Sequence, residues 1–211
     1  MVRSRSRVRI PTTAHFLLKN MPFSSGQTNP LSWSEFDQYT RTLQQKVEKF
    51  FYNKKEKIDV ICPLHRTGGI VGGILSIRMK ILPILPTQFK YFFNPTSIKQ
   101  ISTLPDFLIA IPEKANILFC EGNTNAGSIS TAAARIIKEK YPEAKIYLAT
   151  VCKVFGGPEK LAGIEDIFYG VMTDEAFKAE AEDFQKYELR KGITIFPWEN
   201  IEDELTEINN A

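Results

Sequence analysis

The amino-acid sequence predicts an α/β protein built on a parallel sheet that is flanked by helices. Two observations carry this prediction. Short apolar segments that fit buried strands alternate along the chain with segments that fit helices, and strands joined through helices run parallel. Two glycine-containing turns directly follow two of these strands, and such sheets bind ligands at the carboxyl ends of their strands. With 211 residues, the chain is long enough to form one domain with a hydrophobic core.

The composition is that of an ordinary globular protein. Hydrophobic residues make up 43% and charged residues 24% of the chain, and no apolar run is long enough to span a bilayer. The net charge is +3, and a short arginine-rich arm at the start of the chain supplies more than this excess. Because the remainder is close to neutral, we expect neither a membrane nor a nucleic-acid partner.

The cysteines indicate a reducing environment. Each of the three, Cys62, Cys120 and Cys152, lies inside an apolar segment that fits a strand, and their spacing fits no metal site. We therefore expect buried, reduced thiols and a cytoplasmic protein.

The first 20 residues stand apart from the rest of the chain, since they contain arginines and serines but no acids. Such a composition occurs in organellar presequences and in nucleic-acid-binding arms. However, Val8-Arg9-Ile10-Pro11 is what the bases GTTCGAATCC encode, and these bases resemble the T arm of a tRNA gene. We therefore expect residues 1–20 to be a non-native or disordered arm, and residues 21–211 to form a single domain that begins at Met21.

The first half of the domain alternates helices and strands. Ser32 and Glu35 form a capping box, and apolar residues at helical spacing extend the predicted helix over residues 33–52. A strand at 58–62 then ends in a glycine-containing loop at 63–69, which leads into an apolar helix at 70–79. We expect short strands at 81–85 and 107–111. Residues 87–102 have no clear period, and we interpret them as a mobile excursion with some strand character.

The central stretch, residues 116–135, predicts a strand, a polar turn and a helix. The strand at 117–120 ends in Glu121, the turn follows at 122–128, and an alanine-rich helix comes next. The unpaired N–H groups and the positive dipole end at such a helix start suit a phosphate. Thr124 and Ser128 can add hydroxyl donors. An ordinary turn between a strand and a helix remains the alternative for this stretch taken alone.

The last third predicts one more strand of the sheet and then a change of character. Residues 145–153 are rich in β-branched side chains, as in a strand. Residues 159–169 look irregular, 174–187 fit an acidic helix, 193–199 fit a late strand and 200–209 fit a tail helix. We interpret residues 154–199 as a small C-terminal hood over the sheet.

Taken in order, these stretches resemble the type I phosphoribosyltransferases, particularly the purine-salvage group of xanthine, guanine and hypoxanthine enzymes. The resemblance extends over residues 33–204. Five pieces carry it: the opening helix that starts at Trp33, the strand and turn with Arg66-Thr67-Gly68-Gly69, the central stretch with its acid and Gly/Thr-rich turn, Lys153, and Phe196-Pro197-Trp198-Glu199.

The resemblance implies that phosphoribosyl diphosphate binds with Mg2+, that pyrophosphate leaves, and that a nucleobase nitrogen attacks the ribose carbon through an oxocarbenium-like state. Positioning and charge stabilisation then carry catalysis. Arg66 would hold the pyrophosphate with the amides of Thr67 and Gly68, with His65 beside them. Glu121 would bind the ribose hydroxyls directly or through magnesium. Lys153 would select an oxo-substituted base, and the 5′-phosphate would lie in the turn formed by Gly122, Asn123, Thr124, Asn125, Ala126, Gly127 and Ser128.

Three positions depart from the pattern of this family. Gly122 stands where a second acid is usual, so one ligand of the sugar is missing. Asn125 stands where an acid is thought to assist proton transfer at the base, and an amide cannot take up a proton near neutral pH. Ile193 stands where purine enzymes place an aromatic residue against the base.

We therefore expect an enzyme, a phosphoribosyltransferase that acts on a nucleobase, with a purine-like base favoured and with a homodimeric assembly. The alternative is a protein of the same fold that binds phosphoribosyl diphosphate or a nucleotide without turnover, as a sensor or regulator. Gly122 and Asn125 favour the non-catalytic binding protein, whereas the retained Arg66 and Lys153 favour the enzyme.

Overall fold

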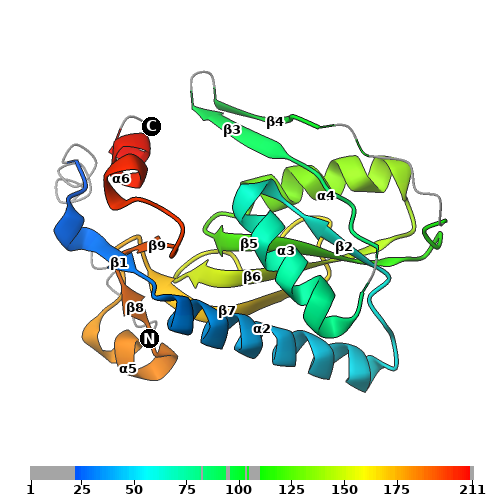
Figure 1. The fold of residues 1–211 in the computed structure, drawn as a ribbon, viewed down its shortest axis with the longest axis horizontal. Coiled ribbons are helices and arrows are strands. Elements are labelled where there is room, and N and C mark those ends of the chain that lie inside the picture. Colours follow the sequence, from blue (N-terminus) through cyan, green and yellow to red (C-terminus); the bar gives the residue numbers. More distant parts are fainter. Residues whose placement is uncertain (1–21, 82, 94–95, 103, 105–109, 210–211) are drawn as a thin grey trace, which may run out of the picture.

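The computed structural model describes residues 22–81, 83–93, 96–102, 104 and 110–209. Its centre is a five-stranded sheet with the strand order β2-β5-β6-β7-β8, in which all neighbours pair in parallel (Figure 1). This confirms the predicted parallel sheet. The strands are β2 (Val60–Pro63), β5 (Asn116–Thr124), β6 (Lys145–Val154), β7 (Ile167–Asp174) and β8 (Arg190–Lys191).

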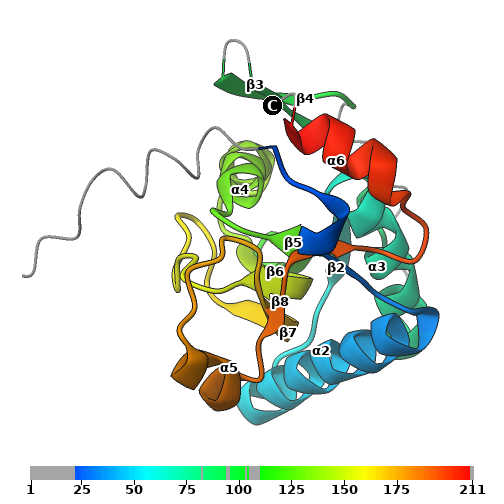
Figure 2. The ribbon, with the colours of Figure 1, turned by 90° about the vertical axis from the view of Figure 1, so that its left-hand side faces the viewer.

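Three helices cover the two faces of this sheet (Figure 2). Helices α2 (Trp33–Lys54) and α3 (His65–Met79) pack with Leu118 and Tyr147 in one buried cluster. Helix α4 (Ser128–Lys140) packs with Ile117 and Ile146 in another. Because successive side chains of a strand point to opposite faces, neighbouring residues of β5 and β6 fall into different clusters. The sheet is therefore buried on both sides, as its continuous apolar strands predict.

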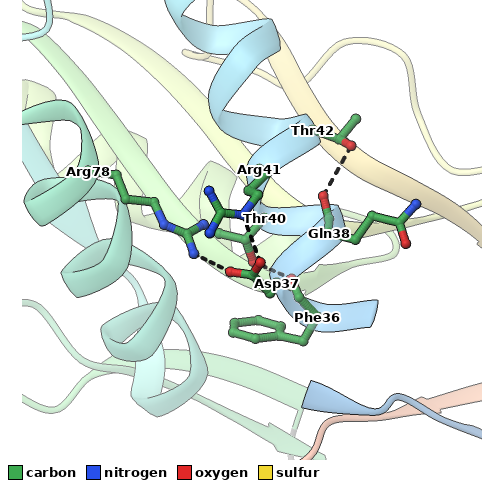
Figure 3. Close-up of polar contacts among 7 residues, drawn as sticks. All are labelled: Phe36, Asp37, Gln38, Thr40, Arg41, Thr42 and Arg78. Carbon is green, nitrogen blue, oxygen red and sulfur yellow. Dashed lines mark hydrogen bonds and ion pairs between the residues drawn. The ribbon is translucent and has the colours of Figure 1, made fainter. Parts of the chain in front are cut away.

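Helix α2 begins at Trp33 as the sequence predicts. The Ser32 hydroxyl accepts a hydrogen bond from the Glu35 amide, and the Glu35 carboxylate accepts one from the Ser32 amide. One turn further on, the Asp37 carboxylate accepts hydrogen bonds from Arg41 of the same helix, at 2.7 Å, and from Arg78 of α3 (Figure 3). This ion pair ties the two helices of one face together.

A second group of elements gathers beyond the carboxyl ends of the sheet strands, at the left of Figure 1. Strand β1 (Thr28–Pro30) pairs in parallel with β9 (Ile193–Ile195), although the two are far apart in the sequence. Trp198, which follows β9, packs edge-on against Phe36 of α2 at 4.9 Å between ring centroids. The group also contains the 3-10 helix η1 (Ser25–Gln27), α5 (Ala181–Tyr187) and α6 (Ile201–Asn209).

The segment predicted as an excursion forms an antiparallel hairpin of β3 (Phe89–Phe93) and β4 (Thr96–Gln100). Figure 1 shows it extending away from the sheet, above α4. Phe89 is buried in the same cluster as α4. Just before the hairpin, the Thr87 hydroxyl donates a hydrogen bond to the Pro63 carbonyl at 2.9 Å, so the hairpin begins beside the carboxyl end of β2.

Several predicted boundaries differ from the structure because they depend on distant contacts. The predicted strand at 81–85 is wrong, since Ile84 forms only an isolated bridge with Ile61. Helix α3 begins at His65, so residues 65–69 are not a loop. The predicted helix at 174–187 is confined to α5, and residues 167–169 belong to β7 instead of an irregular segment. The predicted hood at 154–199 thus contributes β7 and β8 to the main sheet. The arm at 1–20, Met21 and most of the predicted strand at 107–111 lie outside the described residues.

Among the residues that the structure describes, no helix combines the length and apolar character needed to cross a membrane.

Candidate functional site

Two adjoining cavities open at the carboxyl ends of β2 and β5, each of about 240 Å³. We call the first the turn cavity, because it surrounds the turn between β5 and α4. We call the second the hood cavity, because residues of β9 and α6 close it from above. His65, Glu121 and Asn123 line both cavities, so one ligand can extend from one into the other.

The start of α4 forms the floor of the turn cavity. Strand β5 continues to Thr124, so the turn is shorter than predicted and consists of residues 125–127. Gly127 caps the helix at φ 67°, a conformation that glycine adopts without strain. The amides of the first helical turn have no partner within the helix, and they suit an anion. The predicted phosphate-binding residues Asn123, Thr124, Asn125, Ala126, Gly127 and Ser128 all line this cavity.

Glu121 is buried under the turn and bonded to its neighbours. Its carboxylate accepts hydrogen bonds from the Thr124 hydroxyl at 2.6 Å and from the Ser130 hydroxyl at 2.7 Å. Burial raises the pKa of Glu121, although the two hydroxyls and the nearby charge of His65 oppose this shift. The Thr124 hydroxyl, predicted as a phosphate donor, is thus directed to Glu121, and both Glu121 oxygens already have partners.

Gly122 lies where the chain has no room for a side chain. A Cβ atom at this position would lie 2.1 Å from Thr67 Cγ2 and 3.0 Å from Phe196 Cζ. Strand β5, the start of α3 and the segment after β9 approach one another closely at Gly122. This close approach leaves no space for the second acid that the family has at this position. The sequence shows the glycine but not its neighbours.

The predicted pyrophosphate-binding residues form the first turn of α3. His65 has a left-handed backbone at φ 61°, and its Nδ1 donates a hydrogen bond to the Phe89 carbonyl at 2.8 Å. Thr67 and Gly68 line the hood cavity, and a Cβ at Gly68 would lie 2.2 Å from the Cys120 carbonyl oxygen. Arg66 is exposed and lines neither cavity. Its guanidinium lies near Glu199 and Glu204. Its positive charge lowers the pKa of both carboxyls, whereas burial raises the pKa of both.

The structure places Lys153 away from the position of a base-selecting residue, which the resemblance implies for it. It pairs in register with Thr124, but its side chain lines neither cavity. Its ammonium contacts the Glu159 carboxylate at 2.8 Å, with the lysine side chain 4% and the glutamate side chain 86% exposed. The lysine is thus buried beside the turn and paired with an acid of the surface loop that follows β6.

The hood cavity combines apolar walls with carboxylates. Ile193, at the predicted base position, lines it and is buried, as is Phe196. The acids that line it are Glu121, Glu175, Glu199 and Glu204. The pKa of each is raised, and burial is the largest cause for each. His65 is the only basic side chain among the described residues that line this cavity.

Glu175 is the functional candidate that sequence reasoning missed. It directly follows β7, and its carboxylate accepts hydrogen bonds from Asn123 and from the Thr194 amide. The prediction of an acidic helix at 174–187 did not place this acid at the end of a strand. A polar residue at the carboxyl end of an apolar strand-like segment was the available signal, but it requires β7 to be recognised as a strand of the sheet.

Within the described ranges, no group of three or more His, Cys, Asp or Glu side chains could hold a metal ion. Glu121, the residue expected to contact magnesium, is buried, and each of its oxygens accepts a hydrogen bond from a neighbouring hydroxyl. We therefore assign no magnesium ligand among the described residues.

The fold is that of the type I phosphoribosyltransferases, and three solved structures illustrate the likeness. A purine phosphoribosyltransferase from Pyrococcus horikoshii has a TM-score of 0.57 at 18% identity, over 83% of this chain and 95% of that chain. A xanthine-guanine-hypoxanthine phosphoribosyltransferase from Helicobacter pylori has a TM-score of 0.55 at 15% identity, over 85% and 99%. A protein from Neisseria gonorrhoeae with bound ppGpp has a TM-score of 0.54 at 16% identity, over 90% and 98%.

The likeness is one of structure. No family model matches the sequence, and no curated protein matches it. At these identities the solved structures establish the fold, and the chemistry has to be argued from the residues of this chain.

Proposed function

We propose that this protein is a phosphoribosyltransferase, which transfers the 5-phosphoribosyl group of phosphoribosyl diphosphate to a purine-like nucleobase and releases pyrophosphate. The single observation that carries this proposal is the pair of adjoining cavities that share His65, Glu121 and Asn123. One cavity lies at a helix start that suits a phosphate, and the other has the apolar walls that suit a planar base. A nucleotide likewise carries a phosphate at one end and a planar base at the other.

In this proposal the turn at 125–127 and the first amides of α4 hold the 5′-phosphate. The Thr67 amide, which is unpaired in the first turn of α3, holds the pyrophosphate, and Arg66, exposed outside the two cavities, reaches it from the solvent side. Magnesium would belong to the substrate, bound to phosphoribosyl diphosphate, and would supply positive charge beside the leaving group. The residues of the chain bind and orient, and no covalent nucleophile is needed.

Glu121 acts in this proposal as a positioning residue. Its carboxylate fixes the hydroxyls of Thr124 and Ser130, which lie on the two sides of the phosphate-binding turn. Because Glu121 is buried beneath the turn and holds these two hydroxyls, we do not assign it a direct bond to the ribose. The acid absent at Gly122 leaves the sugar held mainly through its phosphate and pyrophosphate.

The test is magnesium-dependent pyrophosphate release from phosphoribosyl diphosphate with a panel of bases: guanine, xanthine, hypoxanthine, adenine, orotate, uracil and nicotinamide. We expect release that depends on a purine and that falls by at least about 100-fold in Arg66→Ala, since a guanidinium that contacts developing charge is typically worth 10²-fold or more. A matched control is Arg135→Ala, because Arg135 lies on the exposed side of α4 and pairs with Glu139 of the same helix. Absence of release with every base would refute the proposal.

A second candidate function is binding of a nucleotide without turnover. The closed space at Gly122 and the amide at Asn125 favour it, since both remove acids that a transferase of this fold uses. The Neisseria gonorrhoeae protein of the same fold was solved with ppGpp bound, which supports a ligand-binding role for this fold. Nucleotide binding measured by calorimetry, together with no pyrophosphate release, would support this function over the transferase.

A further inference from the structure

Glu175 is held rigidly at the edge of the hood cavity by donors from three strands. The Asn123 side-chain Nδ2 of β5 lies 2.8 Å from each of its two oxygens, and the Thr194 amide of β9 lies 3.1 Å from Oε1. The Thr173 hydroxyl of β7 lies 3.4 Å from Oε1. Because a carboxylate has about four acceptor positions, Oε2, which accepts only from Asn123, keeps one free.

Asn123 supplies a second acceptor beside the first. Its amide orientation is determined by Glu175, since only Nδ2 can donate to a carboxylate. Its Oδ1 is buried and has no hydrogen-bond partner among the residues that the structure describes. A buried acceptor without a partner is unfavourable and is rare in folded proteins. Asn123 and Glu175 both line the hood cavity, and a small rotation of the Asn123 amide would turn this oxygen to a donor of a ligand in the cavity.

Two neighbouring acceptors fit a ligand edge that carries two neighbouring N–H donors. A 2-amino-6-oxopurine presents such an edge with its ring N1–H and its exocyclic amino group. A 6-oxopurine without a substituent at C2 presents the ring donor alone, and a 2,6-dioxopurine turns a carbonyl oxygen towards the acceptors. The buried apolar side chains of Ile193 and Phe196 border the same cavity and suit a flat ring.

We propose that Glu175 and Asn123 are the specificity-determining residues of the hood cavity, and that they select a 2-amino-6-oxopurine over bases that lack the 2-amino group. This inference depends on the proposed function in one respect, namely that the hood cavity holds the base. It replaces the role that the sequence assigned to Lys153, whose ammonium is paired with Glu159 outside the cavity.

The experiment compares nucleotides that differ only at C2, so that turnover is not required. Calorimetry of the wild-type protein with GMP, IMP and XMP is expected to show GMP binding at least about 10-fold more tightly than IMP, as for a hydrogen bond to a charged group. XMP is expected to bind more weakly than IMP, because its C2 carbonyl faces two acceptors. Equal affinities for GMP and IMP would overturn the inference, as would no binding of any of the three.

Variants test whether Glu175 and Asn123 cause the preference for GMP over IMP. In Glu175→Gln, an amide replaces the carboxylate, and we expect the GMP-to-IMP preference to fall to about 3-fold or less while XMP gains relative to IMP. Asn123→Ala is expected to reduce the same preference by removing the second acceptor. Glu182→Gln, a matched change at an exposed position of α5, should leave all three affinities unchanged. A preference that survives in Glu175→Gln would overturn the inference.

The two proposals fail in different ways. Release of pyrophosphate with hypoxanthine as fast as with guanine would overturn the selection by Glu175 and leave the transferase standing. No release with any base, together with preferential GMP binding, would refute the transferase and leave the selection standing.

Discussion

The contact at Gly122 gives a prediction whose size follows from the structure. A methyl group introduced by Gly122→Ala would lie 2.1 Å from Thr67 Cγ2, whereas carbon atoms in contact are separated by roughly 3.5 Å or more. One of the two groups must therefore move by about 1.4 Å, and Phe196, with Cζ at 3.0 Å, blocks the other side. Overpacking of this kind costs about 1–3 kcal/mol, and we expect the free energy of unfolding to fall by that amount.

The companion variant removes the atom that clashes. Thr67→Ser deletes Cγ2 and keeps the hydroxyl, so Gly122→Ala should cost less than about 1 kcal/mol in this background, where only the Phe196 contact remains. The control is Gly73→Ala in α3, because a Cβ there meets nothing within 4 Å. This change should stabilise the protein by about 0.5–1 kcal/mol through the helix propensity of alanine.

The assay is urea unfolding of the four proteins and the wild type at one pH, followed by circular dichroism. A Gly122→Ala protein as stable as the wild type would refute the reasoning. An equal loss in the Thr67→Ser background would also refute it, because the cost would then not arise from the Thr67 methyl. If the prediction is met, an acid cannot be restored at position 122 without first changing position 67.

Two further predictions concern stability. Burial raises the pKa of Glu121 above its ordinary value of 4.5, so the folded state keeps this proton to higher pH than the unfolded state, and the free energy of unfolding should fall as the pH rises from 4.5. Glu121→Gln should flatten this fall in urea titrations between pH 4 and 7.5, whereas parallel curves would contradict the assignment. Arg190 of β8 contacts the Glu35 carboxylate of α2 at 2.8 Å, with both side chains about one-third exposed, so Arg190→Ala should lower the free energy of unfolding by about 1 kcal/mol. Arg190→Lys should recover part of that loss in the same assay, and an unchanged midpoint in Arg190→Ala would show that this pair contributes nothing.

The order of the central elements can be predicted from the amino-acid sequence. The capping box at Ser32 places the start of α2, and the apolar runs of β2, β5 and β6 are recognisable because a strand buried on both faces must be apolar throughout. The position of Gly127 at the start of α4 follows from local turn chemistry. These features depend on residues that are close in the chain, which is why they can be predicted without the structure.

Which side chains come into contact depends on long-range packing that the sequence patterns do not show. β1 pairs with β9 across more than 160 residues, and β7 joins the sheet although its sequence alternates little. The hydroxyl of Thr124 turns to Glu121, the ammonium of Lys153 turns to Glu159, and Glu175 reaches Asn123.

The physical reason is that a local pattern determines which elements form, whereas the partner of a polar side chain depends on the donors and acceptors that packing brings near it. Asn123 illustrates the difference. The sequence places it in a polar turn, and the structure places it at the end of β5 with its amide directed by an acid 52 residues away. The character of the hood cavity, with its carboxylates and one unpartnered oxygen, therefore arises from long-range packing and from no single motif.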